Sequence, residues 1–240
     1  MDESLKLYTY WRSSAAYRVR IALNLKGLAY ESIAVHLAKD EQHAAGFHEI
    51  NPQELIPVLR HGGRVLTQSL AIMEYLDEAF PDRPLLPAVA RDRQRARAIA
   101  AMVACDIHPL GNLRVQQYLE RELGATAEQR EAWTRHWIGT GFVAIERVLA
   151  DSPSTGEFCE GDRPTVADCC LVPQVYNARR FKLDLAAFPN IARIDAACQA
   201  LEAFDAARRP AVPAAPHRRP PAPDRPHRCA RCWETPQGPA

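Results

Sequence analysis

Hydroxyl and amide side chains stand at two points where the sequence predicts that helices begin. Ser13-Ser14 precedes a helical pattern over residues 15–26, and Gln68-Ser69 precedes another over residues 70–80. The first turn of a helix carries unpaired backbone N–H groups and the positive end of the helix dipole. Hydroxyls at such a point either cap the helix or help to hold an anion, and from the residues alone both interpretations stay open.

Several established catalytic motifs are missing from the sequence. It contains no G-x-S-x-G, no G-x-x-x-x-G-K-[ST] and no H-E-x-x-H, so a serine hydrolase of that type, a P-loop nucleotidase and a zincin are not expected. Cys229 and Cys232, with His227 nearby, look like half of a zinc site. No second pair of ligands accompanies them, and we therefore expect no metal.

The order of strands and helices predicts a β-α-β-loop-β-β-α unit in the first 82 residues. The expected elements are a strand over 5–10, a helix over 15–26, a strand over 30–35, an irregular stretch over 36–54, a hairpin over 58–67 and a helix over 70–80. Gly27 stands where the first helix should end, and Pro57 leads into the hairpin. On the first helix, Arg18, Arg20 and Lys26 are expected to lie mostly off the apolar face.

Prolines between residues 81 and 87 mark a linker, after which apolar residues recur with a helical period. The expected helices cover 90–122, 126–150, a buried stretch opened by Thr165, and 190–206. Pro109 should kink the first of them because proline has no N–H to donate. Thr165 and Asp168 have the spacing of a capping box. The sequence thus predicts an α/β domain over 1–82, an all-α domain over 88–207 and a tail over 208–240.

Charge is distributed unevenly along the chain. The 240 residues have a net charge of +1, but the tail carries seven Arg and two acidic residues, so residues 1–207 carry 23 basic and 27 acidic ones. An acidic body does not favour nucleic acid as a partner. Nine of the 19 prolines lie in the tail. We expect it to be disordered and dispensable, the alternative being a basic docking arm.

Three further features bear on the compartment. No run approaches 18 consecutive apolar residues, so no membrane span is expected. The first residues include two acids and no apolar segment, which argues against a secretory signal and for the cytoplasm. The seven cysteines form an odd set, and reduced thiols are expected instead of disulfides.

Five motifs in order resemble the zeta-class glutathione transferases, the family of the maleylacetoacetate isomerases. The first motif contains Trp11-Arg12-Ser13-Ser14-Ala15, and the motifs as a set cover residues 8–23, 51–52 with 56–59, 68–72, 106–113 and 171–181. The resemblance extends over about residues 5–206. It implies a thioredoxin-like N-terminal domain, an all-helical C-terminal domain, glutathione as the cofactor and a cytosolic homodimer.

The resemblance implies that Ser13 and Ser14 are catalytic because they stabilise the glutathione thiolate, with Ser13 favoured. The family commonly has cysteine where this sequence has Ala15, so a cysteine nucleophile at that point is excluded. Lowering a thiol pKa by about two requires roughly 2.7 kcal/mol. A hydroxyl hydrogen bond to a charged acceptor supplies roughly 1.5–3 kcal/mol, and a helix N-terminus adds about 0.3–1 kcal/mol. Together they suffice without a general base.

The remaining expected site residues also follow from the resemblance. Besides the two serines, the expected glutathione contacts are Gln42, Ile56, Pro57, Gln68, Ser69, His108 and Asn112. Pro57 is expected to be cis, and His108 and Asn112, four residues apart, to share one helix face. Arg180 is expected to bind the carboxylates of a diacid substrate, with Arg12 and Arg18 as weaker candidates; the alternative for Arg180 is a surface arginine.

The implied function is the glutathione-dependent cis–trans isomerisation of maleylacetoacetate to 4-fumarylacetoacetate, a step of tyrosine catabolism. Addition of a thiolate makes the cis double bond single, rotation follows, and elimination returns the trans product and the glutathione. Two catalytic alternatives stay open, a maleylpyruvate isomerase and a glutathione transferase for small acids. A non-catalytic interaction module is a fourth interpretation, against which the retained serines weigh.

Overall fold

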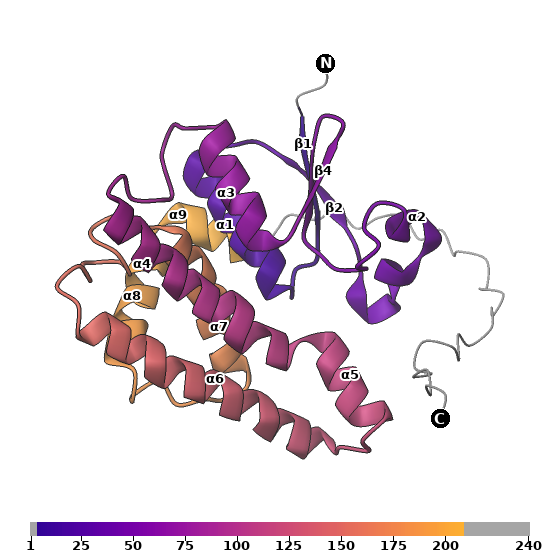
Figure 1. The fold of residues 1–240 in the computed structure, drawn as a ribbon. Coiled ribbons are helices and arrows are strands. Elements are labelled where there is room, and N and C mark those ends of the chain that lie inside the picture. Colours follow the sequence, from indigo (N-terminus) through magenta and orange to yellow (C-terminus); the bar gives the residue numbers. More distant parts are fainter. Residues whose placement is uncertain (1–3, 209–240) are drawn as a thin grey trace, which may run out of the picture.

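The N-terminal half is built on a four-stranded mixed sheet (Figure 1). The computed structural model describes residues 4–208. Strands β1 (Leu5–Thr9), β2 (Glu31–Ala34), β3 (Val58–His61) and β4 (Arg64–Thr67) lie in the order β2-β1-β3-β4. β1 runs parallel to β2 and antiparallel to β3, with Leu7 opposite Ser32 on one side and Leu59 on the other. Because β2 returns parallel to β1, a helix must cross over between them.

Two helices of this half begin at the predicted hydroxyl runs. α1 spans Ser14–Lys26, follows β1, and ends at Gly27, whose left-handed φ of 69° suits a residue without a Cβ. α3 spans Ser69–Ala79 and follows the β3–β4 hairpin. The stretch expected to be irregular holds short helical turns instead, at Leu37–Lys39, Glu41–His43 and α2 (Ala45–His48). The β-α-β-β-α order is confirmed, and the structure adds these turns to it.

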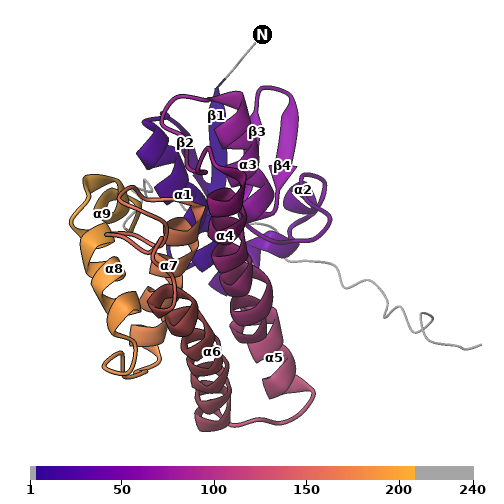
Figure 2. The ribbon, with the colours of Figure 1, turned by 60° about the vertical axis from the view of Figure 1, so that its left-hand side comes forward.

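The second half is helical, as expected, but two of its predicted helices are broken. Its helices are α4 (Ala90–Ala101), α5 (Leu113–Arg121), α6 (Ala127–Ala150), α7 (Val166–Arg180), α8 (Pro189–Gln199) and α9 (Glu202–Arg208). Figure 2 shows this half in profile, with α5 and α6 reaching away from the sheet. The helix predicted over 190–206 is wrong as one piece, because the chain turns at residues 200–201 so that α9 can dock on α1.

The single helix predicted over 90–122 is also wrong. After α4 the backbone widens into a π turn (Met102–Ile107) and then tightens into a 3₁₀ turn (His108–Gly111) that contains Pro109. Asn112 is extended, and its side chain accepts a hydrogen bond from the Arg114 N–H at 3.1 Å, which caps a new helix. The sequence predicted a kink at Pro109, but the structure has a full break there and a new helix after it.

Helix α1 lies at the centre of the molecule and is buried on nearly every side. It packs against α3, α7 and α9. Arg18, Arg20 and Lys26 are therefore buried, which corrects the expectation that they lie off the packed face. Lys26 is neutralised, because its Nζ lies 3.0 Å from the Asp77 carboxylate. The helical period identified the apolar face, but contacts on the other faces come from chain segments far away in sequence.

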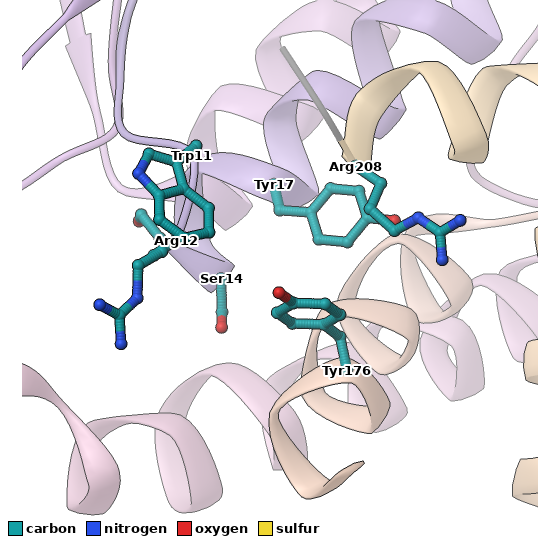
Figure 3. A pocket seen from close by; sticks show the side chains of 7 residues that line it. Trp11, Arg12, Ser14, Tyr17, Tyr176 and Arg208 are labelled. Atoms are coloured by element: carbon teal, nitrogen blue, oxygen red, sulfur yellow. The ribbon is translucent and has the colours of Figure 1, made fainter. Parts of the chain in front are cut away.

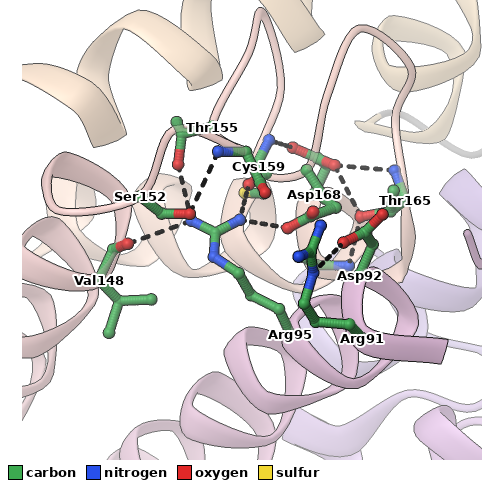
Figure 4. A network of polar contacts seen from close by, with 12 residues as sticks. Arg91, Asp92, Arg95, Val148, Ser152, Thr155, Cys159, Thr165 and Asp168 are labelled. Carbon is green, nitrogen blue, oxygen red and sulfur yellow. Dashed lines mark hydrogen bonds and ion pairs between the residues drawn. The ribbon is translucent and has the colours of Figure 1, made fainter. Parts of the chain in front are cut away.

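Polar contacts hold the loop between α6 and α7 against α4 (Figure 4). Arg95 of α4 donates to the Cys159 carbonyl at 2.7 Å and to Thr155 Oγ1 at 2.6 Å, and it pairs with Glu160. The predicted capping box is confirmed at the start of α7, where Asp168 accepts from the Thr165 N–H at 2.8 Å. These contacts fix α7, which carries the C-terminal side of the candidate site.

No helix within residues 4–208 is both long enough and apolar enough to cross a membrane.

Candidate functional site

The turn between β1 and α1 places two serine hydroxyls at a helix N-terminus. Ser13 is the N-cap of α1, and its Oγ accepts from the Ala16 N–H at 3.2 Å. Its own O–H is left to donate. Ser14 is the first residue of the helix, and its Oγ has no hydrogen-bond partner among residues 4–208. The capping interpretation is therefore confirmed for Ser13. The anion-binding interpretation stays a prediction, for which the hydroxyl protons of both serines are left.

The two serines open into a hollow between the domains (Figure 3). The residues that line it are Trp11, Arg12, Ser13, Ser14, Tyr17, Tyr176 and Arg208. Ser14 points into the open space, and the hydroxyl end of Tyr176 faces it from α7. Burial raises the pKa of Tyr17 to about 12, and its O–H donates to the Phe204 carbonyl at 3.3 Å, so Tyr17 is a wall of the hollow and not a base.

Arg12 lines this hollow, and Arg180 lies near enough to Arg12 to feel its charge. Arg12 is exposed on the rim, and its guanidinium carbon lies 5.4 Å from the Trp11 ring. Arg180 is exposed at the end of α7, 5.1 Å from the Phe181 ring. Partial burial lowers the pKa of Arg180, and repulsion by the Arg12 charge lowers it further. The structure thus brings the two arginines close enough to repel, an arrangement that two carboxylates of one ligand would relieve.

The start of α3 forms a second group of polar side chains. Gln68 precedes the helix with a positive φ of 66°, and its Nε2 donates to Gln53 Oε1 at 2.9 Å. Ser69 is buried, and its Oγ accepts from Arg18 Nη1 at 3.1 Å. The Ile56–Pro57 peptide is cis, as expected, and both residues are buried at the start of β3. Asn51 fixes the turn before it by donating to the Leu55 carbonyl at 2.7 Å.

The sequence matches known proteins over nearly its whole described length. Residues 3–78 match the glutathione S-transferase N-terminal domain. The chain is 54% identical to a probable maleylacetoacetate isomerase of Vibrio cholerae, covering 84% of this chain and 94% of that protein. It is 52% identical to a maleylpyruvate isomerase of a Ralstonia species, covering 88% and 98%.

Solved structures of related proteins point to the same family as the sequence matches. A maleylpyruvate isomerase described as a bacterial zeta-class glutathione S-transferase superposes with a TM-score of 0.84 at 51% identity, covering 86% of this chain and 99% of that one. The chain belongs to this zeta class. A maleylacetoacetate isomerase of Methylobacterium extorquens AM1, solved with malonate and glutathione, also superposes with a TM-score of 0.84, at 44% identity, covering 87% of this chain and all of that one.

Other expected contacts of the zeta-class site fall in different places. Gln42 is buried in the turn after β2, and its Oε1 has no partner among the described residues. His108 lies in the 3₁₀ turn, where burial and the nearby Arg18 charge lower its pKa to about 3. Asn112 caps α5 in an extended conformation. The expectation that His108 and Asn112 share one helix face is therefore wrong, because the chain is not α-helical between them.

Sequence reasoning gave no role to several residues that line the zeta-class hollow. Tyr176 precedes Arg180 by four residues, so the helical period could have placed both on one face of α7. The predicted tail includes Arg208, but this residue is the last of α9 and lines the hollow, which corrects that boundary. Nothing in the sequence pattern identified Trp11, a residue that is 53% exposed and lines the hollow.

Within residues 4–208 the structure shows neither a cysteine at the hollow nor a cluster of metal-ligating side chains. The five cysteines there are free, and none lines the hollow. Burial raises the pKa of Cys170 to about 11 and also raises the pKa of Cys159, Cys169 and Cys198. No group of three or more metal-ligating side chains occurs in residues 4–208. Cys229 and Cys232 lie outside the described residues, as does the tail from residue 209 on.

Proposed function

We propose that this chain is a glutathione-dependent cis–trans isomerase that converts maleylacetoacetate to 4-fumarylacetoacetate. Maleylpyruvate is the alternative substrate, because a maleylpyruvate isomerase is as similar in sequence as the maleylacetoacetate isomerases. The observation that carries the proposal is the hollow itself, where the hydroxyl protons of Ser13 and Ser14 lie beside Arg12, and Arg180 is close enough to Arg12 for the two charges to repel. An anionic nucleophile and a diacid are what these groups would bind side by side.

The serines would hold the thiol of glutathione as a thiolate. When bound, glutathione supplies the nucleophile that adds to the cis double bond and leaves after rotation. Ser13 donates its O–H while its oxygen stays bonded to the Ala16 N–H, so the helix end polarises the donor. Ser14 offers a second O–H with no competing partner in the described chain. Neither role needs a cysteine at Ala15.

The polar groups around α3 and β2 fit the rest of the glutathione molecule. Ser69 and the first N–H groups of α3 form an anion-binding helix end suited to the γ-glutamyl carboxylate. Gln42 contributes a buried carbonyl oxygen that lacks a donor among the described residues, which an amine or amide of the ligand would satisfy. We assign His108 and the Ile56 backbone to the same ligand, whereas Asn112 is already engaged as a helix cap.

Arg12 and Arg180 would bind the two carboxylates of the maleyl substrate. Their positive charges repel in the described chain, and a bound dianion would relieve this repulsion. The dianion would therefore bind with a more favourable free energy than it would at an isolated arginine. The relative from Methylobacterium extorquens was solved with a small dicarboxylate and glutathione together. The presence of both molecules in a protein 44% identical supports the binding of a diacid beside glutathione in this chain.

We also propose that the protein is a homodimer that works in the cytoplasm. The five free cysteines of the described chain support a reducing compartment. Sedimentation equilibrium of the purified protein would show a mass of about twice 26.8 kDa if the dimer exists. A sedimenting monomer at micromolar concentration would contradict it.

The deciding experiment measures isomerisation of maleylacetoacetate and maleylpyruvate in parallel, with and without glutathione. We expect turnover of at least one maleyl substrate that depends on glutathione. The ratio of the two kcat/KM values decides the substrate. Retention on immobilised glutathione without turnover of either acid would overturn the isomerase and support a non-catalytic binding module.

A further inference from the structure

Arg18 is a buried arginine whose charge has no carboxylate partner in the described chain. It lies in the second turn of α1, and only 2% of it is exposed. Within residues 4–208 no Asp or Glu oxygen lies within 4 Å of its guanidinium. Its Nε and Nη2 have no hydrogen-bond partner there, and Nη1 donates to Ser69 Oγ at 3.1 Å. A guanidinium buried in this way is rare, because desolvation penalises the charge unless an anion compensates it.

The groups around Arg18 do not supply that anion. Cys105 and Cys170 are the titratable groups that favour its charged form, and both are thiols. The positive field of Arg18 instead helps to keep His108 neutral, since it lowers the pKa of that imidazole, which burial has already depressed, to about 3. Among residues 4–208, the one side chain that Arg18 binds is therefore the hydroxyl of Ser69, at the N-terminus of α3.

The bond to Arg18 also decides what Ser69 can do. Because Ser69 Oγ accepts from a charged donor, one of its two lone pairs is occupied and its O–H is free to donate away from Arg18. Ser69 is the first residue of α3, so its polarised proton is available at the same helix end as the unpaired N–H groups of the first turn. The whole assembly is suited to one acceptor, an anion bound at the N-terminus of this helix.

We infer that Arg18 is a positioning residue for glutathione, whose γ-glutamyl α-carboxylate is the missing counter-ion of this buried arginine. Arg18 acts through Ser69, which it orients and polarises, and it needs no direct contact with the ligand. The inference rests on the proposed glutathione function and adds a residue that the sequence offered only as a weak candidate for the substrate. It also explains why a charge without a partner in the described chain stands in the core.

Arg20 is the matched control, because it is equally buried and lies two residues away on the same helix. Its guanidinium donates to the Ala207 carbonyl at 2.8 Å, to Thr9 Oγ1 at 2.8 Å and to the Tyr10 carbonyl at 3.3 Å. Three protein acceptors therefore hold Arg20, which leaves only its Nη2 without a partner among residues 4–208, whereas one hydroxyl holds Arg18 and leaves both its Nε and its Nη2 without one. The first arrangement serves the fold, and the second leaves binding capacity for a ligand.

The test compares Arg18→Met with Arg20→Met and the wild type, by calorimetric titration with two ligands. One is glutathione, and the other is 4-aminobutyryl-cysteinylglycine, which keeps the γ-glutamyl amine and lacks only the α-carboxylate. For Arg18→Met we expect glutathione to bind about 10-fold or more weakly, and the analogue to change by less than about 2-fold. The melting temperature of the free protein should stay equal or rise, because an apolar side chain removes an unpaired charge.

For Arg20→Met we expect the reverse, a lower melting temperature with an unchanged ratio of the two affinities. Ser69→Ala should lose the same preference for the carboxylate, and combining it with Arg18→Met should add little, because the two residues act as one unit. Equal weakening of both ligands by Arg18→Met, or a variant that cannot fold, would overturn the inference, since Arg18 would then serve the structure. A wild type that binds neither ligand would instead refute the glutathione function itself.

Discussion

Ser13 carries two hydrogen-bonding roles on one hydroxyl. Its oxygen caps α1, and its proton is the donor proposed for the thiolate. Ser14 is proposed for the second role and does not serve the first. Removing the Ser13 hydroxyl therefore tests helix capping and the proposed catalytic role together. Removing the Ser14 hydroxyl tests the proposed catalytic role alone.

Ser13→Ala should lower kcat by about 10²-fold, in line with the loss of one preorganised donor. It should also lower the free energy of unfolding by about 1 kcal/mol, because the N-cap is lost. Ser13→Thr keeps hydroxyl and cap and serves as the control. Isomerase assays and urea unfolding on the same preparations measure both effects. Full activity in Ser13→Ala together with loss in Ser14→Ala would reverse the assignment of the two serines.

Arg180 and Arg179 are neighbours with different partners. Arg179 pairs at 2.6 Å with Asp195, which is buried, whereas Arg180 is repelled by the Arg12 charge. Arg180→Leu should raise the KM for the diacid about 10-fold or more and leave glutathione affinity unchanged. Arg179→Leu should lower the melting temperature, because a buried carboxylate loses its partner, and leave KM unchanged. Equal losses of diacid and glutathione binding in Arg180→Leu would mean that Arg180 is structural.

His108 makes stability depend on pH. Its pKa is about 3 in the folded chain and about 6.5 when unperturbed, so the unfolded chain takes up a proton first as the pH falls. Its contribution is fully present above pH 6.5 and is lost progressively as the pH falls toward 3, with a slope of up to about 1.4 kcal/mol per pH unit. Urea unfolding of His108→Gln over that window should show a correspondingly flatter pH profile. An unchanged profile would show that His108 titrates normally.

At the scale of elements, α1 organises the molecule. Its first turn carries the serines, its second turn carries Arg18, and its other face holds the last helix. Three of its side chains donate to backbone carbonyls of α9, namely Tyr17 to Phe204 at 3.3 Å, Arg20 to Ala207 at 2.8 Å and Asn24 to Ala203 at 3.0 Å. A short helix that would be marginal by itself is thereby fixed beside the hollow.

The docking of α9 should depend on Phe204, which is fully buried. Phe204→Ala should lower the free energy of unfolding by about 3–5 kcal/mol, as expected for a large core side chain. Glu202→Ala, on the exposed side of the same helix, should change it by less than about 0.5 kcal/mol. Chemical unfolding of both variants measures the difference. A loss below about 1 kcal/mol in Phe204→Ala would contradict the docking of α9 on α1.

At the scale of the whole molecule, α9 extends to Arg208, one residue into the predicted tail. A cut after Ala207 would remove Arg208, which lines the hollow. A chain that ends after Arg208 should keep its melting temperature, oligomeric state and kinetics, because residues 209–240 are rich in proline and poor in apolar residues. A chain that ends after Leu201 should melt at a much lower temperature. Scanning calorimetry and sedimentation of both truncations test this, and a destabilised 1–208 chain would assign the remainder a structural role.

The sequence by itself determined the elements and the chemistry of their ends. The local signals are the run rich in apolar and aromatic residues over 5–10, the helical period after Ser13, Gly27 at the C-terminus of α1 and the Thr165–Asp168 capping box. The structure confirms the element or cap that each one predicts. They succeed because a cap or a period involves residues only a few positions apart. The motif at 8–23 is local in the same way, and its two serines line the hollow in the structure.

Only the tertiary structure decided which charges are buried and which side chains meet. Arg18 looked solvent-facing because its helix has an apolar stripe elsewhere, and α3, α7 and α9 then covered the remaining faces. Tyr176 and Arg208 reach the hollow from helices more than 150 residues after Ser14 in the chain. The breaks at residues 102–112 and 200–201 likewise depend on packing. Burial depends on the assembled chain, because the segment that covers a side chain often lies far away in the sequence. A local sequence pattern therefore cannot predict it.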